Sequence, residues 1–193
     1  MVCFQSEQAA EGVYGKGTDN SELRDKLIGA LIGLARATDG NEDLVSSSTD
    51  KVVIEGLLAA VASVSCDKEA ITGLIARVQE EKRRLVPNCF GCAAPCGRTG
   101  DYDMQELWTA DEDVRSLKSL ILLSIRGMAE YACHASAPGF DDKDVIRFIY
   151  KALFVIGMDQ GADELLPVVS EAGEVSFKCM TMPDNDDSYS GRL

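Results

Sequence analysis

The chain has 193 residues and carries 19 Lys and Arg against 32 Asp and Glu, a formal net charge of −13. A surface this acidic repels nucleic-acid phosphates and anionic lipid headgroups, so we expect binding to neither nucleic acid nor a membrane. Hydrophobic residues make up 46% of the chain, which predicts a soluble globular protein with a substantial core. No apolar run approaches the roughly 18 residues that a membrane-spanning helix needs.

The first residues and the cysteine content together indicate a reducing compartment. Residues 1–7 have neither the basic start nor the apolar stretch of a secretory signal peptide. Seven cysteines cannot all pair in disulfides within one chain. We therefore expect a cytoplasmic protein with reduced thiols, and ask whether some of these thiols bind a metal.

Apolar residues spaced three and four apart predict an all-α fold with six main helices and no strand. The predicted ranges are 21–38, 50–63, 67–84, 111–136, 141–156 and a last helix from 162 that bends at Gly173. Ser21, Asp50 and Asp67 are the predicted N-caps of the first three helices, because short polar side chains satisfy free backbone amides there. The predicted inward stripe of the fourth helix is Val114, Leu117, Leu120, Ile121, Ile125, Met128 and Tyr131.

A weak internal repeat suggests how these helices are grouped. Residues 23–35 align with residues 117–129 at an offset of 94, so that Gly33 corresponds to Gly127. The second helix of each half aligns at an offset of 92, with Val53 opposite Val145. The repeat predicts two three-helix bundles in tandem, joined by a loop rich in Cys, Gly and Pro. The expected parts are an N-terminal segment 1–20, a first bundle 21–86, a connector 87–110, a second bundle 111–182 and a flexible tail 183–193.

The cysteine-containing connector is the sharpest chemical signal. Cys89, Cys92 and Cys96 fall within eight residues, among glycines and a proline that allow the sulfurs to converge. Zinc and iron–sulfur clusters use thiolates at this spacing, because one turn brings two sulfurs to one metal. A fourth ligand is needed, and Cys3 is the candidate. The alternative is three reduced structural thiols with no cofactor.

The remaining cysteines and the single histidine have simpler structural explanations. Cys66, Cys133 and Cys179 occupy apolar positions on or beside helices and are expected to be small core residues. His134 lies near the end of the fourth helix, where a cation suits the helix dipole, and has no nucleophile or carboxylate partner in the sequence. We therefore expect no general acid or base from it.

Two further motifs are weaker candidates for ligand sites. Residues 12–18 contain glycines and a lysine, but their spacing differs from that of a phosphate-binding loop and no strand precedes them. Asp101, Asp103 and Glu106 together suggest a site for a hard cation, although Asp residues before a helix are more often caps.

Several segments resemble one known family. They include residues 3–8, 12–16, 23–35, 88–104, 111–118 and 127–135. The first three resemble the start of the hybrid-cluster protein family, also called hydroxylamine reductases, and the others resemble its connector and second bundle. The resemblance implies an all-helical N-terminal domain of two three-helix bundles, which agrees with the repeat. It also implies oxidoreductase activity on hydroxylamine for a complete family member.

The family's N-terminal cluster is expected to be absent here. The resemblance implies a cubane iron–sulfur cluster held by four cysteines near the N-terminus, of which Cys3 matches the first. Ser6 stands at the second position and Tyr14 at the last, and the segment with the third ligand is missing. Oxygen donors are harder than thiolate and replace it poorly on cluster iron.

The family's catalytic cluster is expected to be absent as well. In the family, two further domains follow and supply the His, Glu and Cys ligands of the hybrid cluster. The present sequence ends at residues 184–193, about where the linker to those domains begins, so we expect no hydroxylamine or nitric-oxide reduction by this chain alone.

Three hypotheses follow. The first is a non-catalytic helical interaction module with a protein partner, either a second copy or a full-length reductase. The second is an electron-transfer module that binds zinc or an iron–sulfur cluster through Cys3, Cys89, Cys92 and Cys96. The third is a fragment of a hydroxylamine or nitric-oxide reductase, against which the substituted residues Ser6 and Tyr14 argue.

Overall fold

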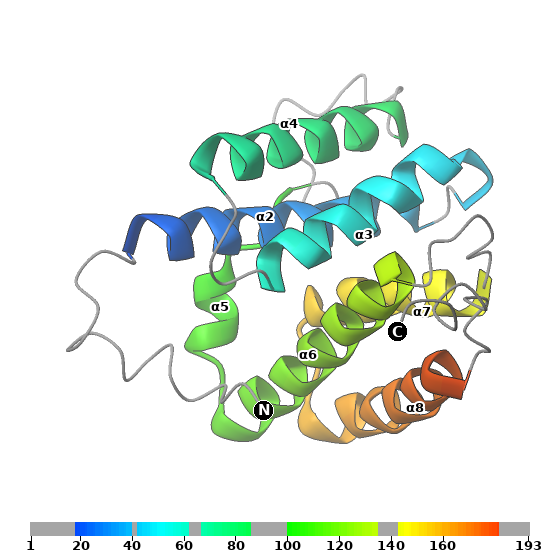
Figure 1. Cartoon of the computed structure of the whole chain (residues 1–193). Helices are drawn as coiled ribbons and strands as arrows, with labels where there is room; N and C mark the ends of the chain where they lie inside the picture. The colour runs from blue at the N-terminus through cyan, green and yellow to red at the C-terminus, as the bar shows by residue number, and fades with distance from the viewer. Residues whose placement is uncertain (1–17, 40–41, 62–66, 86–99, 135–142, 182–193) are drawn as a thin grey trace, which may run out of the picture.

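The computed structural model describes residues 18–39, 42–61, 67–85, 100–134 and 143–181, and every element within these ranges is helical (Figure 1). This confirms the all-α prediction. The elements are α2 (Thr18–Thr38), the 3-10 helix η2 (Glu42–Leu44), α3 (Ser47–Val61), α4 (Lys68–Leu85), α5 (Met104–Trp108), α6 (Glu112–His134), α7 (Lys143–Ile156) and α8 (Ala162–Thr181). None of the described helices is both long and apolar enough to cross a membrane.

Two of the three predicted N-caps are wrong. Helix α2 begins three residues before Ser21, and α3 begins three residues before Asp50. The cap of α3 is Ser46, whose side chain accepts from the Thr49 amide at 3.3 Å, while the Thr49 hydroxyl accepts from the Ser46 amide at 3.3 Å. This reciprocal arrangement is a capping box in which threonine takes the place of the usual glutamate. Asp67 immediately precedes α4, where a cap is expected.

Helix α5 was not predicted, because five residues are too short to show a helical period. Its N-cap is Asp103, whose side chain accepts from the Gln105 amide at 2.9 Å. Met104 and Leu107 are buried and attach the short helix to the core.

The helices form two groups of three, α2–α4 and α6–α8, and every pair within a group is in contact. In each group the first and third helices run parallel and the middle one antiparallel (Figure 1). Between the groups, α2 contacts α7 and α3 contacts α6. In the repeat, α2 corresponds to α6 and α3 corresponds to α7. The contact of α2 with α7 is therefore the counterpart of the contact of α6 with α3. These contacts agree with the repeat, but the contacts between the groups are as extensive as several of those within them, so the arrangement as two tandem bundles stays a prediction.

One core joins the two groups. It includes Leu27 and Leu31 of α2 together with Ile121 and Ile125 of α6, all fully buried. Cys179 is also buried, as predicted for a small core residue.

The predicted stripe of α6 is wrong at Leu120, which is 50% exposed. Lys118, two residues earlier, is buried in its place. Side chains two positions apart on an α-helix point about 200° apart around the helix axis, so burial of Lys118 turns Leu120 toward solvent. Lys118 tolerates burial because its ammonium group donates to the Met158 carbonyl at 2.7 Å.

Candidate functional site

The four candidate metal ligands Cys3, Cys89, Cys92 and Cys96 lie outside the described residues. The same holds for Ser6, Tyr14 and Cys66, and for the side chains of Cys133 and His134. The metal site therefore stays a prediction. Among the residues that the structure describes, no group of three or more His, Cys, Asp or Glu side chains is placed to hold a metal ion.

The structure does describe where the cysteine-containing connector begins and ends. It leaves α4 at Leu85, and the described chain resumes at Gly100. The Asp101 carboxylate accepts from Gln79 Nε2 at 2.7 Å and from Lys82 Nζ at 2.5 Å, and both donors belong to α4. Asp103 is a cap, as predicted for this acidic cluster, whereas Asp101 is not a cap and instead binds α4. Both ends of the connector are attached to the last turns of α4.

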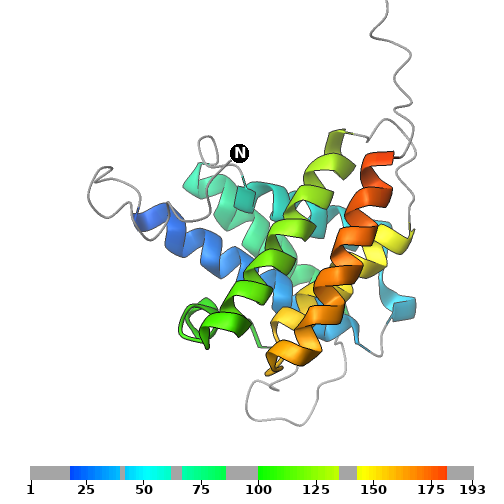
Figure 2. The same ribbon diagram turned by 90° about the horizontal axis from the view of Figure 1, so that it is seen from below.

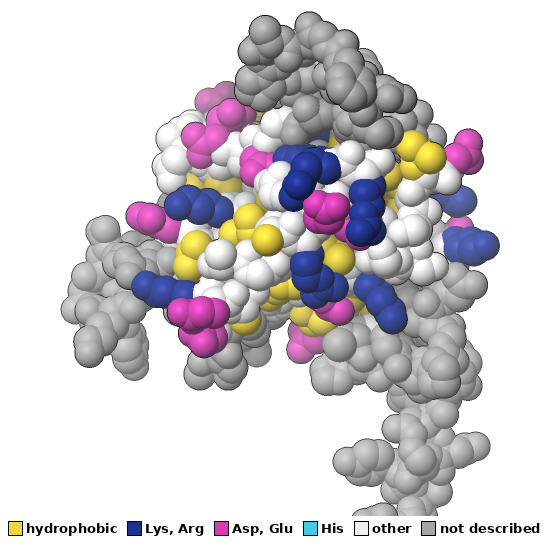
Figure 3. Space-filling model, turned by 90° about the horizontal axis from the view of Figure 1, so that it is seen from above, with side chains coloured by type: hydrophobic (Ala, Val, Ile, Leu, Met, Phe, Trp, Pro, Cys, Tyr) yellow, Lys and Arg dark blue, Asp and Glu magenta, His cyan; other side chains and the backbone are white. Residues whose placement is uncertain are grey.

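Each basic side chain in the last turn of α4, where the connector starts, is paired with a carboxylate: Lys82 with Asp101, Arg83 with Glu80, and Arg84 with Glu80 and Glu81. Lys82, Arg83 and Arg84 form the basic last turn of α4, and the Lys82 side chain is only 12% exposed. Viewed from the α4 side, Lys and Arg side chains lie among carboxylates on this face (Figure 3).

Within the second half of the connector, residues 100–102 cross α2 at very close range. The Tyr102 amide donates to the Gly29 carbonyl at 3.0 Å. A Cβ atom on Gly29 would lie 2.2 Å from the Tyr102 carbonyl oxygen, and one on Gly33 would lie 2.9 Å from the Gly100 oxygen. Only glycine at these two positions allows residues 100–102 to lie directly on the helix.

Tyr102 lies at a junction of both helix groups. Its ring centroid is 5.4 Å from Arg36 Cζ and 6.0 Å from Lys118 Nζ. Arg36 donates to the Gly157 carbonyl and Lys118 to that of Met158, just beyond the end of α7. Cations at a helix C-terminus satisfy its free carbonyls and the helix dipole. Burial, followed by the charge of Glu106, raises the pKa of Tyr102 to about 12. Burial lowers the pKa of Lys118.

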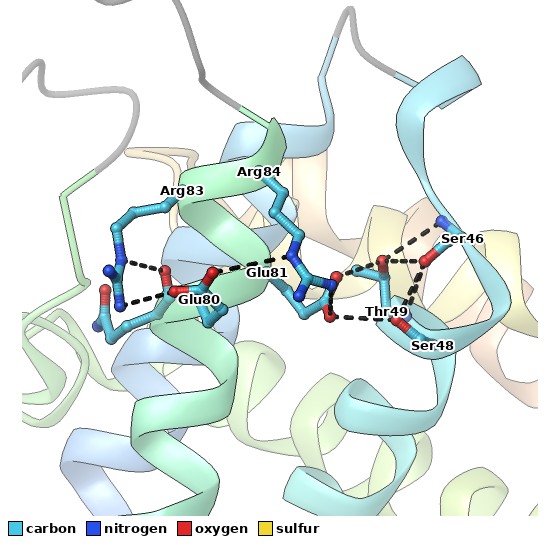
Figure 4. A network of polar contacts seen from close by, with 8 residues as sticks. Ser46, Ser48, Thr49, Glu80, Glu81, Arg83 and Arg84 are labelled. Atoms are coloured by element: carbon cyan, nitrogen blue, oxygen red, sulfur yellow. Dashed lines mark hydrogen bonds and ion pairs between the residues drawn. The ribbon is translucent and has the colours of Figure 1, made fainter.

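A second polar cluster joins α3 to α4 (Figure 4). The buried Glu81 carboxylate accepts from the Thr49 hydroxyl at 2.9 Å, the Ser48 hydroxyl at 3.1 Å and the Arg84 guanidinium at 3.0 Å. A carboxylate near the N-terminus of α3 is also favoured by the helix dipole. With donors from both α3 and α4, the Glu81 carboxylate holds the two helices together.

A third contact crosses between the helix groups. The Tyr150 hydroxyl on α7 donates to the Asp50 carboxylate on α3 at 3.0 Å. Burial, followed by the charge and hydrogen bond of Asp50, raises the pKa of Tyr150. Asp50, predicted as a cap, instead joins the two groups.

The central positions of Lys118, Glu81 and Tyr150 were not predicted from the sequence. A signal was present for two of them. Lys118 stands at an inward position between Val114 and Ile121, and Glu81 stands between Val78 and Leu85 in the same way. A charged residue in register with a buried stripe indicates a buried hydrogen-bonded group.

Comparison with known proteins agrees with the resemblance. The sequence model of the Prismane/CO dehydrogenase family matches residues 2–189. The chain belongs to this family. A hydroxylamine reductase of Chlorobaculum tepidum is 31% identical over 98% of the chain, and that of Thermodesulfovibrio yellowstonii is 33% identical over 95%. A hydroxylamine reductase of Desulfitobacterium hafniense is 30% identical over 98% of the chain.

The matched part covers only 39% to 40% of the length of these three relatives. The predicted family is thus confirmed, and the chain corresponds to the N-terminal part of a hydroxylamine reductase. The activity of the whole relatives is a separate question, because most of their length has no counterpart in this sequence.

Proposed function

We propose that this chain is a non-catalytic helical interaction module, homologous to the N-terminal part of the hydroxylamine reductases, that binds a protein partner. The partner is a full-length reductase of the family or a second copy of the chain. The main support is the use of the polar residues within the described helices. Lys118 and Arg36 bind carbonyls beyond α7, and Glu81 and Tyr150 each join two helices. These groups build a rigid body and do not converge on a substrate.

The extent of the family match gives further support. In the relatives, about three-fifths of the protein lies outside the matched part. A domain that belongs to a multidomain protein has surfaces that contact the neighbouring domains, and such surfaces resemble protein–protein interfaces. We therefore expect such surfaces on these helices.

Activity and assembly measurements on the purified chain test this function. Hydroxylamine reduction is measured with a reduced dye as electron donor, and the molar mass is measured by light scattering. The control is the full-length Thermodesulfovibrio yellowstonii enzyme, which is assayed alone and mixed with the chain. We expect no turnover by the chain and a complex with the enzyme or a dimer. Turnover by the chain alone, or a monomer that binds nothing, would contradict the proposal.

A second candidate function is metal binding by the connector. Cys89, Cys92 and Cys96 would hold zinc or an iron–sulfur cluster, with Cys3 as fourth ligand. The supporting observation is the attachment of both connector ends to the basic last turns of α4, through the contacts of Asp101 with Gln79 and Lys82. A bound metal would supply structural cross-linking or, with iron, one-electron transfer.

Metal analysis of protein purified without oxygen tests this alternative. About one zinc per chain, or several irons with acid-labile sulfide, is the expected result if the site forms. The triple variant Cys89→Ser, Cys92→Ser and Cys96→Ser should then lose the metal, whereas Cys179→Ser on α8 should retain it. Absence of zinc, iron and sulfide from the wild-type chain would refute the alternative.

A further inference from the structure

Helices α6 and α8 form one outer side of the second helix group. They are in contact, begin at the same end of the molecule and run side by side in parallel (Figure 2). The ion pair of Glu171 with Lys151 identifies the side of α8 that faces α7. Leu166 and Phe177 point about 120–140° away from Glu171 around the helix axis, and they are 51% and 65% exposed. This part of α8 therefore faces solvent rather than α7.

Each of the two helices carries an outward row of four exposed residues. The rows are Ser116, Leu120, Leu123 and Gly127 on α6, and Leu166, Ser170, Gly173 and Phe177 on α8. In both rows the steps are four, three and four residues, which is the spacing of the apolar seam in a coiled coil. Each position of the α6 row therefore corresponds to the position 50 residues later in the α8 row. We call the surface made by the two rows the α6–α8 face.

The two rows have opposite orders of residue size. Along α6 the order is small, large, large, small, and along α8 it is large, small, small, large. Each large side chain of one row therefore corresponds to a small residue of the other, as Leu123 corresponds to Gly173 and Phe177 to Gly127. Two such rows pack closely when they face each other, because each large side chain enters the space that a small residue leaves.

The two glycines of the face are not explained by contacts within one chain. A Cβ atom added to Gly127 or to Gly173 would have no neighbour within 4 Å among the described residues. At Gly29, by contrast, an added Cβ atom would lie 2.2 Å from the Tyr102 carbonyl oxygen. Glycine inside a helix is less stable than alanine, and a close approach is the usual reason to keep it. A large side chain that approaches from outside the chain would supply this reason at both positions.

We propose that the α6–α8 face binds the same face of a second copy of this chain, so that α6 of each copy packs in parallel on α8 of the other. A twofold axis along the helices produces this arrangement, because it keeps the helix direction and exchanges the two copies. It places Leu123 against Gly173 of the partner subunit and Phe177 against Gly127 of the partner subunit. This inference rests on the proposed function, from which it selects the second copy as the partner.

The area of the face is sufficient for a dimer. Helix α8 has 20 residues and is about 30 Å long, and two neighbouring helices are together about 20 Å wide. The face thus covers about 600 Å² on each copy and about 1,200 Å² in total, the lower limit for stable specific interfaces. Each copy carries a net charge of −13, so repulsion opposes association and is reduced by salt. We therefore expect a dimer of moderate affinity that becomes tighter at high ionic strength.

Sedimentation equilibrium of the full chain, at about 1–100 μM and high salt, measures the dimer dissociation constant. Gly173→Leu fills the space that Leu123 of the partner subunit needs, so it should raise this constant at least about tenfold. Its matched control is Gly73→Leu on α4, where an added Cβ atom also has no neighbour within 4 Å among the described residues, and this variant should leave the constant unchanged. Combining Gly173→Leu with Leu123→Ala restores one large and one small residue at the contact. The double variant should therefore regain a constant within about threefold of the wild type.

Circular dichroism confirms that each variant is folded, and Gly127→Leu with Phe177→Ala replaces the first pair if that pair does not fold. A wild-type chain that stays monomeric would overturn the inference. So would a dimer that Gly173→Leu leaves intact, or a double variant that does not recover dimerisation. A monomer that still binds the full-length Thermodesulfovibrio yellowstonii enzyme would overturn only this dimer, whereas a monomer that binds nothing would overturn the proposed function as well.

Discussion

Replacement of Gly29 by alanine tests the close crossing of residues 100–102 over α2. The new Cβ atom would lie 2.2 Å from the Tyr102 carbonyl oxygen, a backbone atom that no side-chain rotation moves away. Residues 100–102 must therefore lift from the helix, which breaks the hydrogen bond from the Tyr102 amide to Gly29 and exposes the Tyr102 ring.

The size of the effect follows from three contributions. Alanine favours the helical state by about 1 kcal/mol over glycine. Against this, the hydrogen bond contributes about 1 kcal/mol, and an overpacked site with a displaced, 6% exposed tyrosine costs about 2–4 kcal/mol. We expect Gly29→Ala to lower the free energy of unfolding by about 2–4 kcal/mol in total.

Urea unfolding followed by far-ultraviolet circular dichroism measures this change. Gly73→Ala is the matched control, because Gly73 lies inside α4 with no atom within 4 Å of an added Cβ. It should raise the free energy of unfolding by up to about 1 kcal/mol. A Gly29→Ala variant as stable as the wild type or the control variant would refute the close crossing.

Two further predictions concern the polar contacts between helices. Thr49→Ala should lower the free energy of unfolding by about 1–3 kcal/mol, because it removes a buried donor to Glu81. Ser48 is exposed, so Ser48→Ala should lower it by less than about 1 kcal/mol in the same urea titration. Equal losses would contradict the buried clamp. Tyr150→Phe should be less stable than the wild type below pH 10, because it lacks the hydrogen bond to Asp50. The pKa of Tyr150 is raised in the folded state, whereas in the unfolded chain it is about 10. The contribution of the Tyr150 hydroxyl to the free energy of unfolding is therefore complete below about pH 10 and falls by about 1.4 kcal/mol per pH unit above it. The stability difference between the two proteins should shrink accordingly from pH 10 upward, and a constant difference would exclude this assignment.

The candidate site shows where prediction from sequence stops. The spacing of Cys89, Cys92 and Cys96 can be read without a structure, because metal ligation by a short loop is a local property. The function of Asp101 was less evident, since its partners Gln79 and Lys82 are about 20 residues away in the sequence. Only the contact with α4 reveals its structural role.

The sequence by itself determined the six main helices and the family, because these depend on local periodicity and on residue-by-residue similarity. Buried positions such as Leu27 and Ile121 follow directly from the spacing of apolar residues. The spacing of apolar residues on α6 allows an inward Lys118, but tertiary structure alone decided how its charge is satisfied. The accepting carbonyl belongs to Met158, 40 residues away in the sequence, and no local pattern contains that partner.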